Sequence, residues 1–239
     1  MEMIKKVLYC EGHYFSWKRG DLHTEFGVVI EGDIKKARES VKSNVGKEFK
    51  ILEPNFVDLL RKAKRGPQII TNKDIGLILT ETGIDKESTV LEAGSGSGFL
   101  TCNLARFVKK VVSYERREDF LKIATENAAL LSLENISFKL HDIYESIEGK
   151  NLDLIVLDLP EPWKAIEHSF NALKQGAFFV AYLPSIIQVA EFIKEAEKRF
   201  IIVKISEILE REWHVEPQRV RPASQMIAHT GFLCFLRKI

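Results

Sequence analysis

The sequence predicts an α/β protein whose main part is a doubly wound, mostly parallel sheet with helices on both faces. From Gln68 onward, short apolar runs of strand length alternate with segments of helical spacing. A glycine-rich loop, T-V-L-E-A-G-S-G-S-G at residues 89–98, follows the first strand of this series. Residues 1–66 instead show short apolar runs punctuated by glycines. They predict a small β-rich domain before a larger domain at 67–239.

The first 66 residues favour strands over helices. We expect strands at 7–10, 13–17, 26–30 and 48–52. Residues 33–40 fit either a helical turn or a charged loop, and the sequence leaves both open. Helical spacing appears at 55–64, after Pro54, and ends at Arg65-Gly66-Pro67, where we place the domain boundary.

The second part alternates strictly. Asn72 is a suitable N-cap for a helix over 73–82, and Gly83 ends it. Further helices are expected at 99–107, 117–132, 163–173 and 185–199, and strands around Val90 and Leu91 and at 110–114, 136–140, 152–157 and 177–182. Two closing strands, 201–207 and 231–236, flank a basic insertion at 211–230.

Charge is unevenly distributed along a chain whose net charge is only +1. Residues 1–66 hold 14 basic and 10 acidic side chains, residues 67–210 hold 16 and 22, and residues 211–239 hold 5 and 2. Basic ends around an acidic body indicate an anionic partner, although solvated surface lysines explain such a bias about as often.

Composition also bears on location and cysteine chemistry. No apolar run approaches the roughly 20 residues that span a bilayer, and the N-terminus lacks the apolar core of a signal peptide, so we expect a cytoplasmic protein. Cys10, Cys102 and Cys234 are far apart and form no metal-ligand motif, which predicts no metal site and buried free thiols. A bridge between subunits through Cys234 is the alternative.

The glycine loop indicates which cofactor binds. Gly94, Gly96 and Gly98 are spaced G-x-G-x-G, and the bulky Phe99 stands where a dinucleotide-binding loop has its third glycine. Glu115 ends the next strand, where an acidic residue commonly binds ribose hydroxyls. Glu92 adds a carboxylate that suits a cationic ligand better than a pyrophosphate. S-adenosylmethionine, a sulfonium with an ammonium group, fits these residues.

Two aspartates follow later strands at the same edge of the predicted sheet, where ligands bind in this fold. Asp142 can accept a hydrogen bond from an adenine amino group. Asp158 opens the segment D-L-P-E-P-W, which two prolines stiffen. A carboxylate there, with Trp163 nearby, suits a flat ring held by an edge hydrogen bond and a stacking face. Plain core packing is an equally good interpretation of Trp163.

The order of elements resembles class I methyltransferases. The segments E-A-G-S-G-S-G, Y-E-R-R-E-D-F, D-L-P-E-P-W and R-P-A-S-Q-M-I-A-H-T-G-F-L resemble the tRNA (adenine-N1)-methyltransferase family, especially its archaeal members, over nearly the whole chain. This resemblance implies methylation of adenosine 58 in the T loop of tRNA, and of position 57 in the archaeal type. It also implies a homotetramer, and leaves open a contact between the N-terminal domain and tRNA.

The resemblance also assigns roles to individual residues. The cofactor loop corresponds to Ser95, Gly96, Ser97 and Gly98, with Glu115 on the ribose. Phe120 lines the pocket, Asp142 meets the adenine, and Gln68 lies in a segment that covers the cofactor. Asp158 matches the catalytic aspartate. Thr71-Asn72 replaces the family's usual Tyr-Pro, which puts a tyrosine contact there in doubt. Candidate substrate-binding residues are Tyr182, Trp163, Arg211, Arg219, Arg221 and His229.

Two other functions are consistent with parts of the pattern. One is a class I methyltransferase acting on protein, of the isoaspartyl type, although a stiff aromatic loop after Asp158 suits a flat base better than a flexible peptide. The other is a non-catalytic subunit that only binds tRNA. An intact cofactor loop together with Asp158 argues against that interpretation.

Overall fold

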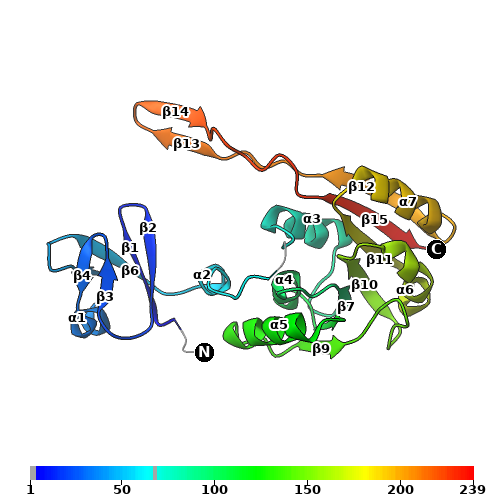
Figure 1. The fold of residues 1–239 in the computed structure, drawn as a ribbon, viewed down its shortest axis with the longest axis horizontal. Helices are drawn as coiled ribbons and strands as arrows, with labels where there is room; N and C mark the ends of the chain where they lie inside the picture. Colours follow the sequence, from blue (N-terminus) through cyan, green and yellow to red (C-terminus); the bar gives the residue numbers. More distant parts are fainter. Residues whose placement is uncertain (1–3, 67–68) are drawn as a thin grey trace. The chain divides into compact units, whose positions relative to one another are not determined.

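A seven-stranded sheet forms the centre of the larger part of the protein (Figure 1). The computed structural model describes residues 4–66 and 69–239. The order across the sheet is β12-β15-β11-β10-β7-β8-β9. The five strands from β11 to β9 run parallel, and β15 is antiparallel to both of its neighbours. The strands are β7 (Thr89–Ala93), β8 (Lys110–Glu115), β9 (Ile136–Leu140), β10 (Leu152–Leu157), β11 (Leu173–Leu183), β12 (Phe200–Glu207) and β15 (Phe232–Lys238).

Helices cover both faces of this sheet, as predicted. Successive β7 residues point to opposite sides because the side-chain period of a strand is two. Val90 therefore packs in the apolar cluster with α3 (Asn72–Thr82) and α4 (Phe99–Ala105), and Leu91 packs in the one with α6 (Ile166–Ala172) and α7 (Ile186–Ala196). Helix α5 (Glu118–Leu130) follows β8. Among the described residues, no helix is both long and apolar enough to cross a membrane.

The N-terminal part forms a separate compact unit, and the division falls between Ala63 and Lys64. Its main sheet has the order β2-β1-β6-β5. One face of that sheet buries Leu8, Trp17 and Phe49 together with Ile34 of the helix α1. The elements are β1 (Lys6–Cys10), β2 (His13–Trp17), β3 (Leu22–Thr24), β4 (Gly27–Val29), α1 (Glu31–Lys36), β5 (Ser40–Lys42), β6 (Glu48–Leu52) and α2 (Phe56–Leu60).

A two-stranded ribbon extends from the closing strands of the larger sheet (Figure 1). It consists of β13 (Trp213–Glu216) and β14 (Arg219–Pro222). Both strands lie within the insertion at 211–230, for which the sequence predicted basic charge but no strands. Cross-strand pairing puts Trp213, Val215, Val220 and Pro222 on one face and His214, Glu216, Arg219 and Arg221 on the other. The ribbon is amphipathic, yet its apolar face is open: Val215 is 74% exposed.

Several local predictions were wrong or incomplete. Thr71, not Asn72, is the N-cap of α3; Asn72 is its first helical residue. The strands β3 and β5, of three residues each, carry too short a pattern to recognise. The undecided segment at 33–40 contains the end of α1. The helix expected over 163–173 is a 3₁₀ turn, η1 (Pro162–Ala165), followed by α6, because the proline-rich start opposes regular α-helix.

All three cysteines are buried free thiols. Cys234 lies within β15, fully buried between the neighbouring strands, and burial raises the pKa of its thiol to about 12. A thiol in this position is protonated and enclosed, so the alternative of a bridge between subunits is not supported.

The turn after β7 requires glycine at position 94. Gly94 has φ of 95°, and a Cβ built there would lie 2.2 Å from the carbonyl oxygen of Asp158. The Asp158 amide donates to the Ala93 carbonyl at 3.0 Å, which holds the ends of β7 and β10 together. A side chain at Gly94 would separate two strand ends that define the site.

Replacing Gly94 with alanine should therefore lower the free energy of unfolding by more than about 2 kcal/mol, because strain and a backbone clash add. The matched control is Gly76→Ala in α3, where φ is not positive and nothing lies within 4 Å of the added methyl. That control should be neutral or stabilising by roughly 0.5–1 kcal/mol. Urea denaturation of both variants checks this; equal stabilities would show that the strand ends separate easily.

Candidate active site

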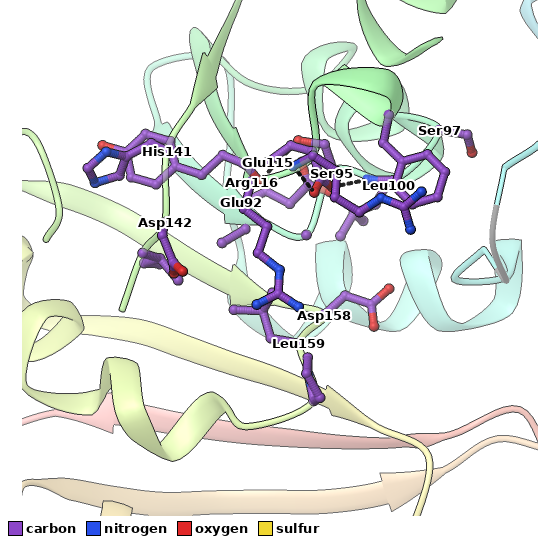
Figure 2. Close-up of a pocket in the computed structure, with 18 of the residues that line it drawn as sticks. Glu92, Ser95, Ser97, Leu100, Glu115, Arg116, His141, Asp142, Asp158 and Leu159 are labelled. Carbon is purple, nitrogen blue, oxygen red and sulfur yellow. Dashed lines mark hydrogen bonds between the residues drawn. The ribbon is translucent and has the colours of Figure 1, made fainter. Parts of the chain in front are cut away.

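A cavity of about 290 Å³ opens at the carboxyl ends of β7, β8 and β10. In the sheet, β8 and β9 lie on one side of β7, and β10 and β11 lie on the other side. The strand order therefore reverses between β7 and β10. Ligands bind at this point in doubly wound folds. The predicted residues that line the cavity are Glu92, Gly94, Ser95, Gly96, Ser97, Glu115, Phe120, Asp142 and Asp158. Figure 2 shows the labelled acidic side chains around this hollow.

Glu92 is a buried carboxylate held by hydroxyl groups. It is 1% exposed, and its Oε2 accepts from Thr101 Oγ1 at 2.5 Å and from Ser113 Oγ at 2.6 Å. Ser113 Oγ also lies 2.5 Å from Ser95 Oγ in the glycine loop. Burial is the main cause of a raised pKa for Glu92, and the two hydroxyl donors oppose it. Sequence reasoning missed Thr101 and Ser113, because single hydroxyl residues in a helix and a strand carry no motif.

Glu115 connects two backbone segments around the cavity. Its Oε2 accepts from the Gly96 amide at 3.0 Å, and its Oε1 accepts from the Arg117 amide at 3.0 Å. Each carboxylate oxygen can accept a second hydrogen bond. Glu115 therefore fixes the loop and keeps acceptor capacity for a pair of ligand hydroxyls.

The carboxyl group of Asp158 has a raised pKa. Burial is the first cause of its raised pKa and the Glu92 carboxylate the second; together they bring the pKa to about 7. Two acidic groups therefore face one cavity, and no basic side chain of the described residues lowers the pKa of either. A positively charged ligand would relieve this cost. These two carboxyl groups, as hydrogen-bond acceptors and negative charges, fit the sulfonium and ammonium groups of S-adenosylmethionine.

The far wall of the cavity comes from the segment after β9. Asp142 Oδ1 accepts from the Tyr144 amide at 2.9 Å, which closes a tight turn. The Tyr144 hydroxyl accepts from the Glu161 amide at 3.3 Å and so joins this wall to the segment after Asp158. His141, which the sequence did not single out, also lines the cavity and packs its ring against Tyr114 at 4.7 Å.

Asn127 of α5 connects the loop to the start of the larger unit. Its amide nitrogen donates to the carbonyls of Ser97 at 2.8 Å and Lys64 at 2.9 Å, and its oxygen accepts from the Lys64 amide at 2.8 Å. The segment that begins here passes Gly66, close to Ser97 and Phe120. Gln68, expected to cover the cofactor, lies outside the described residues.

Other predicted residues do not line this cavity. Gly98 supports it from behind, since a Cβ there would lie 3.0 Å from that of Ala124. Trp163 packs against the core cluster beside α6, which agrees with core packing rather than with a stacking face for a ligand. Tyr182 is 5% exposed and packs against Gly231. The remaining candidates also lie outside the cavity. His229 pairs with Glu207, Arg211 is exposed, and Arg219 and Arg221 are on the ribbon.

The contribution of the hydroxyl groups around Glu92 to stability can be tested directly. Ser113→Ala combined with Thr101→Val removes both donors from a buried carboxylate and should lower the free energy of unfolding at pH 7 by about 2–4 kcal/mol. The loss should shrink at acidic pH, because protonated Glu92 tolerates burial. Thr125→Val is the control, since that hydroxyl donates only to a carbonyl of its own exposed helix face. A loss of unfolding free energy that does not change with pH would contradict the assignment of Thr101 and Ser113 as donors to the Glu92 carboxylate.

Comparisons with known proteins agree with this geometry. Residues 60–229 match the family described as tRNA methyltransferase complex GCD14 subunit. The chain is 35% identical over 245 residues to the tRNA (adenine(57)-N(1)/adenine(58)-N(1))-methyltransferase TrmI of Methanocaldococcus jannaschii, covering 90% of this chain and 86% of that one. It is 38% identical to a tRNA (adenine(58)-N(1))-methyltransferase TrmI of Thermus thermophilus, over 83% of this chain and 80% of that one.

Two solved structures share the whole architecture. A SAM-dependent O-methyltransferase from Thermotoga maritima superposes with a TM-score of 0.91 at 31% identity, over 100% of this chain and 94% of that one. The tRNA (m1A58) methyltransferase TrmI from Aquifex aeolicus gives 0.87 at 28% identity, over 100% and 98%. The seven-stranded sheet with its carboxylate-lined cavity is thus the class I methyltransferase fold, and the chain belongs to the GCD14 family of tRNA methyltransferases.

Proposed function

We propose that this enzyme transfers the methyl group of S-adenosylmethionine to N1 of adenosine in the T loop of tRNA, at position 58 and also at 57. The observation that carries the proposal is the pair of carboxyl groups with raised pKa, Glu92 and Asp158, in a cavity at the switch point of the sheet. The relative from Methanocaldococcus jannaschii, named for both positions, supports the dual site. A tRNA substrate also favours a cytoplasmic location.

The chain's own residues supply binding and orientation. Glu115 and Asp142 offer acceptors to ribose hydroxyls and an adenine amino group, and Phe120 offers an apolar surface on the cavity wall. Residues 94–98 bring the backbone close to the ligand, as their positive φ glycines permit. When bound, S-adenosylmethionine supplies a methyl group on a cationic sulfur. The acidic wall formed by Glu92 and Asp158 favours that charge.

Asp158 has the further role of presenting the target base. Adenine N1 carries a lone pair, so no strong base is needed to activate it, and orientation is the main requirement. Methylation makes the base cationic. An ionised Asp158 that accepts from the exocyclic amino group stabilises this charge in a partly dry site. The target adenosine must leave its stack first, at a cost of a few kcal/mol, which contacts elsewhere on tRNA offset.

We also propose that the protein is a homotetramer joined through the apolar face of the ribbon. A two-stranded ribbon is at best marginally stable alone, and here Trp213, Val215 and Val220 are 58%, 74% and 67% exposed. Pairing with ribbons of other copies would bury them. Arg219 and Arg221 on the opposite face would then stay available for phosphates of tRNA, as would the neighbouring Arg211.

The function is tested by incubating the enzyme with labelled S-adenosylmethionine and unmodified tRNA, followed by nucleoside mapping. We expect 1-methyladenosine at positions 58 and 57. Label in another nucleoside, or in protein alone, would overturn the proposal.

The raised pKa of Asp158 predicts a pH dependence. Because the ionised carboxylate is the active form, kcat/KM should rise as pH rises through about 7 and level off above it. Glu92 titrates in the same cavity, so Asp158→Ala is needed to identify the group. This variant should lose roughly 10²–10³-fold in kcat and flatten the rise, because one charge-stabilising acceptor is gone. Its cofactor affinity by isothermal titration should change only a few-fold; loss of cofactor binding would assign Asp158 to the cofactor instead.

The ribbon predicts an effect on assembly. Trp213→Ser with Val215→Ser should reduce the mass measured by light scattering below that of a tetramer, since the apolar face loses its two large side chains on β13. His214→Ser, on the polar face between them, is the control and should leave the mass unchanged. A parent protein that is monomeric, or a double variant of unchanged mass, would rule out this interface.

A further inference from the structure

The N-terminal sheet has a second face that the cluster around Leu8 does not use; Val7 is buried at one end of this face, and Tyr14 is exposed. Its other face buries Leu8, Trp17 and Phe49 against α1. On the unused face, the strand register places Tyr14, Tyr9, Lys50 and Ser40 directly opposite one another. These four residues come from β2, β1, β6 and β5 in turn, so they form one row across the whole sheet. We call them the tyrosine row.

The two tyrosines form an aromatic surface rather than part of a core. Their ring centroids are 5.0 Å apart, with a 54° angle between the planes. Tyr14 is 56% exposed, and Tyr9 is half-buried beside it. An exposed aromatic pair on adjacent strands costs solubility and adds nothing to the core on the other face. Rings in this position offer a flat surface to a planar ligand.

Charge on the same face favours an anionic ligand. Lys50 lies next to Tyr9 in the row, and Lys42 follows Ser40 by two residues on β5, so it points to the same face. Lys50 is 3.3 Å from Glu48, but both side chains are about half exposed, so this pair contributes little and can be replaced. The 66-residue segment that contains the face carries 14 basic and 10 acidic residues. Adjacent-strand aromatics with neighbouring lysines suit the bases and phosphates of single-stranded RNA.

We propose that the tyrosine row is an RNA-binding platform, on which an unpaired base of the tRNA substrate stacks against Tyr14 while Lys50 contacts the adjoining phosphate. This inference rests on the proposed tRNA substrate and adds a second contact to it, on a unit that contains none of the cavity-lining residues. Such a contact supplies binding energy away from the reacting base, which helps offset the cost of extracting it.

The test measures the affinity of the full-length protein for unmodified tRNA by fluorescence anisotropy at fixed salt. Tyr14→Ala should weaken binding by about 5- to 100-fold, the range for loss of one base-stacking ring. Tyr14→Phe keeps the ring and should stay within about twofold of the parent. Tyr14→Leu keeps apolar bulk without a ring and should resemble alanine, which decides the matter where the alanine variant fails to fold. Cofactor affinity should be unchanged in all three.

Lysine variants test the phosphate contact. Lys50→Gln should reduce the slope of log Kd against log salt by about one. The matched control is Lys36→Gln, an exposed lysine of α1 on the core side of the sheet, which should leave the slope unchanged.

Unchanged tRNA affinity in Tyr14→Ala and Tyr14→Leu would overturn the platform. A changed oligomeric mass in these variants would also overturn it, because a second copy would then occupy the face. If these variants bind tRNA normally and still methylate adenosine, the platform alone fails. If the parent protein neither binds nor methylates tRNA, the proposed function fails with it.

Discussion

The site depends on the close approach of two strand ends. The ends of β7 and β10 meet where the Asp158 amide donates to the Ala93 carbonyl, so the next residue of the loop lies against the Asp158 backbone. Only glycine fits at position 94, and the chain must turn there with positive φ. The same approach puts the side chains of Glu92 and Asp158 on one cavity. Backbone geometry and the electrostatics of the site therefore have a single origin.

The acidic groups of the cavity are each accommodated in a different way. Glu92 is fully buried but receives two hydroxyl hydrogen bonds. Glu115 receives two backbone amides. Asp158 has a raised pKa and stays largely protonated below neutral pH. A cationic ligand would shift it toward the ionised form, which is the form that the proposed methyl transfer uses. In the proposed reaction, binding of the cationic cofactor and ionisation of Asp158 are thus linked.

The sequence was most informative where periodicity or spacing repeats. The alternation after residue 68 and the glycine spacing identified the sheet, the loop and the acidic residues at strand ends, and the structure brings Glu92, Glu115, Asp142 and Asp158 to one cavity. Thr101, Ser113 and Asn127 could not be found this way, because their partners are distant in sequence. For Trp163 the sequence left core packing and ligand stacking both open, because proline-induced stiffness says nothing about which way a ring points; the structure shows core packing. The amphipathic ribbon was missed because four-residue strands barely establish a period.

Asn127 has a consequence for how movement spreads. It is 2% exposed, and its one side-chain amide is hydrogen-bonded both to the glycine loop at Ser97 and to the backbone at Lys64, where the larger unit begins. The loop and the backbone at Lys64 are therefore joined through one side chain, and neither can move away from it without breaking these hydrogen bonds. Ordering of the loop by a ligand would in this way also order the backbone at Lys64.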